Sequence, residues 1–185
     1  MSLFVTDSDY DLTKSKSTYP VSLAEAKRHL RVDVDFRDDD DYIDSLIQAA
    51  TTLAENYINK DIAKTTNTLL IYDFDSDEVT IYEGNYISLI DVVNSADASV
   101  GTLDKITDHY NSFTIEWTAN ITSDPIKITF YTGYDESTVP VIIKQAILTK
   151  IADLYDNARS NFAWSGIQDT KVFETILNYY IMNRF

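Results

Sequence analysis

The sequence has 185 residues, of which 44% are hydrophobic and 12% aromatic, so it predicts a folded protein with one core or one domain carrying an inserted subdomain. It contains no cysteine, which excludes disulfides, thiolate zinc sites and cysteine nucleophiles. Its 30 acidic and 15 basic residues give a formal net charge of -15, and the resulting field repels phosphates and argues against tight general binding to DNA.

The chain begins with a polar arm, residues 1–20, in which only the apolar residues 3–5 suggest a strand or an anchor. We expect this arm to be loosely held. It lacks the basic start and long apolar core of a secretion signal, and no later apolar run approaches the length that spans a membrane. These features predict a soluble, unexported chain with no membrane partner.

Two helices are predicted after the arm. Ser22 and Glu25 have the spacing of a capping box, which indicates a short helix over residues 23–31. From residue 38 to residue 60, apolar side chains recur at every third or fourth position. This period is typical of a long amphipathic helix.

The middle of the chain consists of short segments rich in Ile, Thr, Val, Tyr and Phe, separated by Asp, Ser, Asn and Gly. Apolar residues alternate with polar ones in several of them, for example at Phe113, Ile115 and Trp117. Alternation indicates strands with one buried and one wet face. We therefore predict an antiparallel sheet from the segments NTLLIYDF, EVTIYE, YISLIDVV, SFTIEWT and PIKITFYTG.

Helical spacing returns near the C-terminus. Pro140 suits an early helical position, and the apolar residues that follow predict a helix over 140–158. A linker, residues 158–168, leads to a last amphipathic helix for which Asp169 is the predicted N-cap.

These elements predict an α+β fold. A helical bundle or hairpin is built from residues 21–64 and 138–185, and an antiparallel β-rich subdomain, residues 65–137, is inserted into it. The arm of residues 1–20 precedes both parts.

Four consecutive aspartates, Asp38, Asp39, Asp40 and Asp41, stand before the long helix. We interpret them as N-terminal cap residues, because carboxylates in a first turn accept hydrogen bonds from free N–H groups and oppose the helix dipole, for about 0.3 to 1 kcal/mol each.

Two acidic segments resemble the calcium loop of helix-loop-helix proteins in part, but that loop needs a glycine at its sixth position and a glutamate at its twelfth. A loop starting at Asp33 has Arg37 at the fifth position and Asp38 at the sixth. One starting at Asp73 has Glu78 at the sixth and Gly84 at the twelfth. Both are weak matches, so we predict no metal residue.

The sequence offers no constellation for catalysis. His29 and His109 are not joined to a serine in a nucleophile elbow, and phosphate-loop, dinucleotide and metalloprotease motifs are absent from the sequence. We therefore predict that the protein is not an enzyme and uses no cofactor. The basic residues Lys27, Arg28, Arg31 and Arg37 indicate a solvated helix face or salt bridges to acidic neighbours.

The C-terminal segment crowds aromatic and apolar side chains around one arginine. Such residues are enriched at protein interfaces. We treat them as a candidate partner interface, with packing on the protein's own domain as the alternative: Tyr179, Tyr180, Ile181, Met182, Arg184 and Phe185.

Three blocks of sequence carry a resemblance to a known family. They are YPVSLAEAKRHLRVD, then DDDYIDSLIQAATTLAENYINKDI after an acidic gap, and FYTGYDESTVPVIIKQAILTKIADLYDNARS after the β-rich middle. In this order they resemble the head-tail connector (adaptor) family of tailed bacteriophages. The resemblance covers residues 19–62 and 132–160, while the middle matches longer members in layout only. Ala158 stands where the family has an arginine, which follows here at Arg159.

The resemblance implies a structural protein of the virion neck, assembled in the host cytoplasm. Family members form a ring of about twelve copies, docked on the portal protein at the capsid vertex. Such a ring extends the DNA channel, lets DNA pass without specific binding, and offers a platform for the next neck or tail protein. We expect the helices over 38–60 and 140–158 to form the inter-subunit wall, and the C-terminal residues to dock on the portal.

Two other functions stay open at this point. One is a different neck protein, such as a tail-completion or stopper component, which predicts a hexameric or transient complex. The other is a small enzyme or calcium-binding module, which predicts a thermal shift with calcium.

Overall fold

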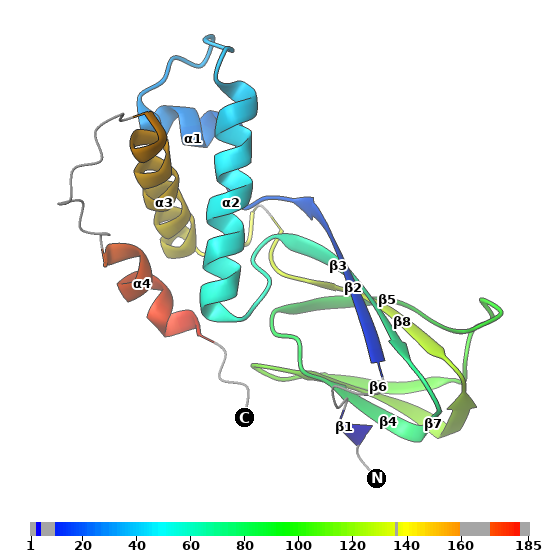
Figure 1. Cartoon of the computed structure of the whole chain (residues 1–185). Helices are drawn as coiled ribbons and strands as arrows, with labels where there is room; N and C mark the ends of the chain where they lie inside the picture. The colour runs from blue at the N-terminus through cyan, green and yellow to red at the C-terminus, as the bar shows by residue number, and fades with distance from the viewer. Residues whose placement is uncertain (1–2, 5–9, 136, 160–170, 182–185) are drawn as a thin grey trace.

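The computed structural model describes residues 3–4, 10–135, 137–159 and 171–181, and it is built from a helical lobe and a β-sandwich (Figure 1). The helical lobe contains α1 to α4. The sandwich contains strands β1 to β8. The predicted α+β fold is confirmed. The boundaries predicted for its subdomains stay a prediction.

The first two helices of the lobe begin and end close to the predicted positions. Helix α1 spans Leu23–Leu30, and its capping box joins Ser22 and Glu25 as the spacing predicted. Helix α2 spans Asp40–Ile58. Each ends at a residue with a left-handed backbone, Arg31 (φ 59°) and Asn59 (φ 55°), which turns the chain out of the helix.

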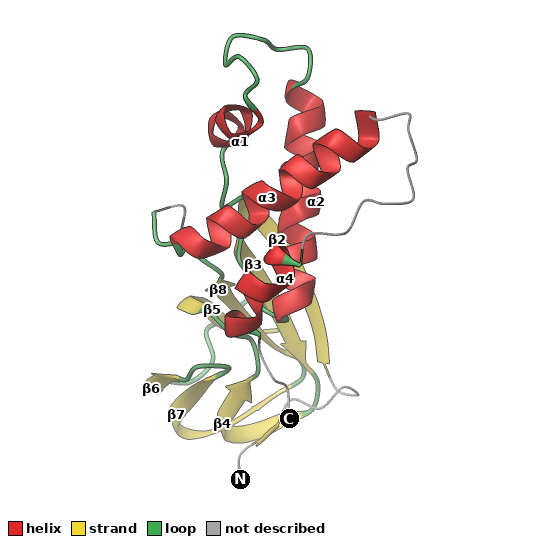
Figure 2. Ribbon diagram, turned by 90° about the vertical axis from the view of Figure 1, so that its left-hand side faces the viewer, coloured by secondary structure: helices red, strands yellow, loops and turns green. Residues whose placement is uncertain are grey.

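The remaining helices complete the lobe. Helix α3 spans Val141–Arg159 and crosses α2, as Figure 2 shows. The last helix is shorter than predicted, because α4 covers Val172–Leu177 and passes into a 3₁₀ turn, η1, at Asn178–Tyr180. The predicted linker from residue 160 and the predicted cap Asp169 lie outside the described residues.

The core of the helical lobe lies between α2, α3 and α4. Each helix contributes residues from the apolar stripe that the sequence predicted, and burial of an Ile, Leu or Phe side chain stabilises by about 1.5–3 kcal/mol. The buried residues are Ile43, Ile47, Ala50, Ala54, Ile58, Ile143, Ala146, Ile147, Ile151, Phe173 and Leu177.

The β-rich part contains two sheets, so the expectation of one sheet is wrong. The first has the order β1-β4-β7-β6 and the second β2-β3-β8-β5. Alternation identifies the buried face of a strand but not the sheet to which it belongs, because both inner faces of a sandwich are apolar. The strands are β1 (Leu3–Phe4), β2 (Tyr10–Thr18), β3 (Lys64–Ile71), β4 (Phe74–Ile81), β5 (Tyr86–Asn94), β6 (Leu103–Asp108), β7 (Phe113–Ser123) and β8 (Ile126–Thr132).

Inward-facing residues of both sheets form one core. Phe113 on β7 packs edge-on against Phe130 on β8, with ring centroids 4.9 Å apart. Phe113 also stacks on Tyr86 of β5 at 4.3 Å. The predicted alternation at Phe113, Ile115 and Trp117 is confirmed, since all three side chains are buried.

The N-terminal arm is part of the sandwich, so the expectation of a loosely held arm is wrong for residues 10–18. These residues form β2, which pairs antiparallel with β3 from Tyr10 to Thr18. Its composition is polar because it is an edge strand with much of its surface in water. The short β1 pairs parallel with β4.

Candidate functional site

The turn that carries the described part of the predicted partner interface, residues 179–181, lies at the C-terminal end of α2. Tyr57 of α2 donates a hydrogen bond from its hydroxyl to the side-chain oxygen of Asn178, at 2.6 Å. Its ring lies 6.3 Å from that of Phe173 in α4. The turn η1 is therefore held on the helical lobe by both polar and aromatic contacts.

The interface residues on this turn differ in exposure. Tyr179 is 82% exposed, whereas Tyr180 packs partly against the helical core and Ile181 is half-buried. The predicted interface residues Met182, Arg184 and Phe185 lie outside the described residues. Tyr179 is thus the member of the described set whose aromatic ring faces solvent.

The four aspartates lie around the start of α2, at the other end of that helix. Asp39 is the N-cap residue, Asp40 and Asp41 lie in the first turn, and Asp38 precedes the cap. The Asp39 side chain makes no cap hydrogen bond, so that part of the interpretation is wrong. Its carboxylate accepts a hydrogen bond from Tyr155 of α3 at 3.0 Å, which ties α3 to the start of α2.

Lys27 does not belong to a solvated basic face, because it is only 2% exposed. Its ammonium group forms an ion pair with Asp40 and donates hydrogen bonds to the carbonyl oxygens of Val34 (3.2 Å) and Phe36 (2.6 Å). A buried cation is tolerated only with such partners. Of the two uses predicted for Lys27, the salt bridge to an acidic neighbour is confirmed. Its burial was not predicted, because lysine is normally exposed.

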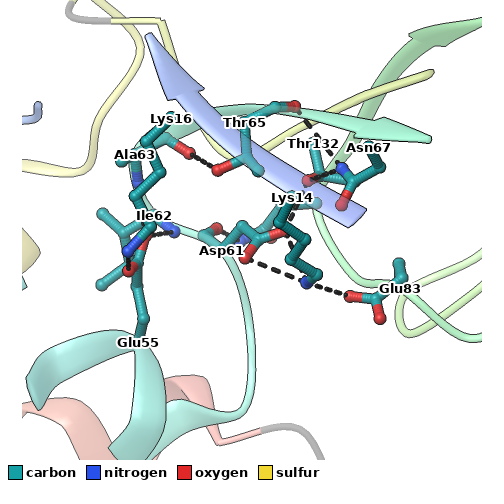
Figure 3. A network of polar contacts seen from close by, with 11 residues as sticks. Lys14, Lys16, Glu55, Asp61, Ile62, Ala63, Thr65, Asn67, Glu83 and Thr132 are labelled. Atoms are coloured by element: carbon teal, nitrogen blue, oxygen red, sulfur yellow. Dashed lines mark hydrogen bonds and ion pairs between the residues drawn. The ribbon is translucent and has the colours of Figure 1, made fainter. Parts of the chain in front are cut away.

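A polar network, which we call the junction network, joins the helical lobe to the sandwich (Figure 3). Asp61, in the connection from α2 to β3, accepts hydrogen bonds from Lys14 of β2 at 3.0 Å and from Thr132 of β8 at 2.6 Å. Lys14 also pairs with Glu83 at 2.9 Å. One lysine on the edge strand therefore bridges two buried carboxylates.

Glu55 of α2 forms the second half of the junction network. One of its oxygens accepts hydrogen bonds from the backbone N–H groups of Ile62 (3.0 Å) and Ala63 (2.9 Å), and the other forms an ion pair with Lys16 of β2. Lys14 and Lys16 are two residues apart, and side chains at this spacing lie on the same face of a strand. This spacing is the sequence signal that would have indicated a strand here.

The chemistry of the junction network is structural. Burial lowers the pKa of Lys14, but the charges and hydrogen bonds of Asp61 and Glu83 outweigh burial and raise it above its ordinary value. Lys60 nearby has its pKa lowered by burial, and its ammonium lies 3.7 Å from the ring centroid of Tyr110. Each of these lysines is engaged within the fold, so the network fixes how the two parts of the protein are oriented.

The sequence candidates for metal binding and catalysis are dispersed. His29 is exposed on α1 and His109 is exposed beyond β6 in the sandwich. The carboxylate of Asp75 accepts hydrogen bonds from Asn120 (2.6 Å) and Thr122 (3.0 Å). Within the described ranges, His, Asp and Glu side chains do not gather in threes in a way that suits a metal ion. The helices of the described part are all too short or too polar to cross a membrane.

Comparisons with known proteins identify similar chains. A family model described as phage gp6-like head-tail connector protein matches residues 20–132, more than half of the sequence. No curated protein matches the chain.

Three solved structures share the fold. A chain in the neck of an empty gene transfer agent (GTA) particle, computed with C6 symmetry, has a TM-score of 0.73 and 17% identity, covering 94% of this chain and 97% of that one. A chain in the virion of the native GTA particle has a TM-score of 0.69 at 17% identity, with coverages of 93% and 96%. One in the neck of the native particle, computed with C12 symmetry, has a TM-score of 0.69 at 16% identity, with coverages of 94% and 97%.

Proposed function

We propose how this chain acts from the premise that it belongs to the phage gp6-like head-tail connector family. Copies of the chain form a ring on the portal protein at the capsid vertex, and the ring extends the DNA channel and joins the next neck or tail protein. The chain is then a structural protein of the virion neck, assembled in the host cytoplasm, and not an enzyme. The family match carries this proposal, because it runs from α1 through β8.

Ring formation is supported by the similar chains and by exposed apolar residues. Two of the GTA necks are described with C6 and C12 symmetry. A ring needs two different complementary patches on each subunit. Leu53 on α2 is 42% exposed, and Val141 and Ile142 at the start of α3 are 74% and 45% exposed. We therefore assign α2 and α3 to the inter-subunit wall.

Portal docking is assigned to the C-terminal segment that begins at Tyr179. This side chain is 82% exposed, while Asn178 beside it is anchored to Tyr57. An exposed tyrosine on an anchored turn loses little conformational entropy on binding, and tyrosine is enriched at interfaces. Tyr180 and Ile181 follow it in the same segment.

The net charge of the chain suits a channel for DNA. With a formal net charge of -15, a ring wall repels the phosphates of passing DNA and does not retain them. DNA therefore passes without specific binding.

Removing the proposed portal contact tests this function. We expect the variant truncated before residue 179 to lose binding to the purified portal of its own particle, measured by co-sedimentation, while Tyr179→Ser weakens binding. Tyr82→Ser is the matched control, because Tyr82 is an exposed tyrosine next to β4, in the sandwich. Unchanged portal binding by the truncated chain would contradict the assignment of this surface.

A further inference from the structure

The loop between α1 and α2, residues 31–39, exposes two apolar side chains. Val34 is 54% exposed and Phe36 is 44% exposed. Single exposed apolar residues are normal on a protein surface. Val34 and Phe36 are two residues apart in the same loop, so this loop offers two exposed apolar side chains for contact with another protein.

Hydrogen bonds from a buried lysine hold the main chain of this loop in place. The buried ammonium of Lys27 donates hydrogen bonds to the carbonyl oxygens of the same two residues, Val34 and Phe36. The N–H of Asp35 donates to the side chain of Asp33 at 3.0 Å, which closes the loop locally. Because the carbonyls are fixed inward while the side chains are exposed, the loop is preorganised, and preorganisation lowers the entropy lost on binding.

Exposed charged residues stand next to the two apolar side chains in the sequence, and the acidic ones outnumber the basic ones. The exposed acidic residues are Asp33, Asp35, Asp38 and Asp41, and the exposed basic residues of the loop are Arg31 and Arg37. Asp40 is already neutralised by its ion pair with Lys27. The loop therefore exposes apolar side chains among charges that are acidic on balance, and it is complementary to an apolar pocket with Lys and Arg beside it.

The loop and the turn η1 lie at opposite ends of α2. Lys27 contacts Asp40 at the beginning of the helix, and Asn178 contacts Tyr57 at its end. A helix of 19 residues is about 28 Å long, so the two surfaces are too far apart for one small contact to cover both. Figure 1 shows the loop at the end of the helical lobe that points away from the sandwich.

We propose that the α1–α2 loop is a second docking surface, which binds a protein with an apolar pocket rimmed by Lys and Arg. This proposal rests on the proposed function, because it assigns the partner to the neck or tail protein that joins the ring on the side away from the portal. Phe36 is the apolar anchor, and the exposed aspartates select a basic rim.

The test uses a paired substitution in which the fold is preserved. Asp35→Lys with Phe36→Ser changes the charge and the anchor but leaves the backbone contacts of Lys27 in place. The matched control is Ile90→Ser with Asp91→Lys, an adjacent exposed apolar and acidic pair on β5. Equal thermal melting of both variants and the wild type checks that each one folds.

Each variant replaces the wild type in producing cells, and capsids are purified. The amount of the protein on capsids is measured by immunoblot, and the fraction of capsids with tails by electron microscopy. We expect the loop variant to be present on capsids in the normal amount. The fraction of capsids with tails should fall about tenfold, which is the size of effect expected when one interface anchor is removed. The control retains tails.

Two results would overturn the proposal. Normal tail attachment by the loop variant would mean that the loop is not a docking surface. Loss of the loop variant from capsids would mean that the loop contacts the portal or a neighbouring copy instead. Absence of the wild type from capsids would contradict the proposed function. In that case, co-sedimentation of the wild type and of the loop variant with purified tails tests whether the loop is a docking surface, independently of the proposed function.

Discussion

Lys27 of α1 forms an ion pair with Asp40 in the first turn of α2, and the same lysine holds two carbonyl oxygens of the loop that connects these helices. One buried cation thus binds α1, the loop and α2 together. Removing it leaves three oxygen acceptors without their partner, which makes Lys27 a direct probe of the helical lobe.

Lys27→Met should lower the free energy of unfolding by about 3 kcal/mol, because it breaks a buried pair by deleting one partner. Urea denaturation followed by circular dichroism measures the change. Arg28→Met is the control, since Arg28 is exposed on the same helix and its loss should stay within about 0.5 kcal/mol. A Lys27→Met protein as stable as the control would show that the buried pair contributes nothing.

Asp61→Ala should destabilise the protein by about 3 kcal/mol, because the ammonium of Lys14 loses one of its two carboxylate partners and the hydroxyl of Thr132 loses its acceptor. Thermal unfolding measures the loss, with Asp104→Ala on the exposed edge strand β6 as the control. Equal melting temperatures for the two variants would rule out a stabilising role for the junction network.

The ion pairs of Lys14 predict a specific dependence of stability on pH. The pKa of Lys14 is raised above 10.5 in the folded protein, so the stabilisation is complete below pH 10.5 and is lost as the pH rises through the folded-state pKa. The difference in unfolding free energy between the wild type and Lys14→Met should therefore be constant near neutral pH and shrink in strong alkali. Burial lowers the pKa of Lys60, but this residue is present in both proteins, so its contribution to the pH dependence cancels in the difference. A difference that grew with alkaline pH would contradict the assignment.

Gly133→Ala should lower stability by more than about 2 kcal/mol. Gly133 follows β8 with φ 92°, and a methyl group there would lie 2.1 Å from the carbonyl oxygen of Ala63. Gly101→Ala is the comparison: its φ is also positive, at 66°, but the added methyl meets the flexible end of the Ile121 side chain. Denaturation should show that the Gly133 variant is less stable than the Gly101 variant. The opposite order would mean that the contact of the added methyl group with the backbone is not the main source of destabilisation.

The positions of the helices followed from the sequence because their signals are local. Ser22 and Glu25 identify the start of α1, and the apolar period of α2 predicts which side faces the core. Leu53 is the exception in that stripe, since it is 42% exposed. Alternation of apolar and polar residues likewise predicted the buried faces of β7 and β8, whose inner residues are buried.

Two of the edge strands, β2 and β6, and the buried charges did not follow from the sequence. Strands β2 and β6 are polar on much of their surface, so alternation of hydrophobicity is weak in both. Lys27 and Asp61 are buried because partners distant in the sequence, or carbonyl groups of the backbone, surround them. A single sequence carries no direct signal for such pairing, which depends on the finished fold.

The measurement that tests the central claim most directly is the mass of the complex formed when the purified protein is mixed with the portal of its own particle, determined by mass photometry. A connector ring predicts a portal that gains about one copy of the 21.1 kDa chain per portal subunit. No gain in mass, with an intact portal and a folded protein, would contradict the ring on the portal and assign the chain to another position in the neck or tail.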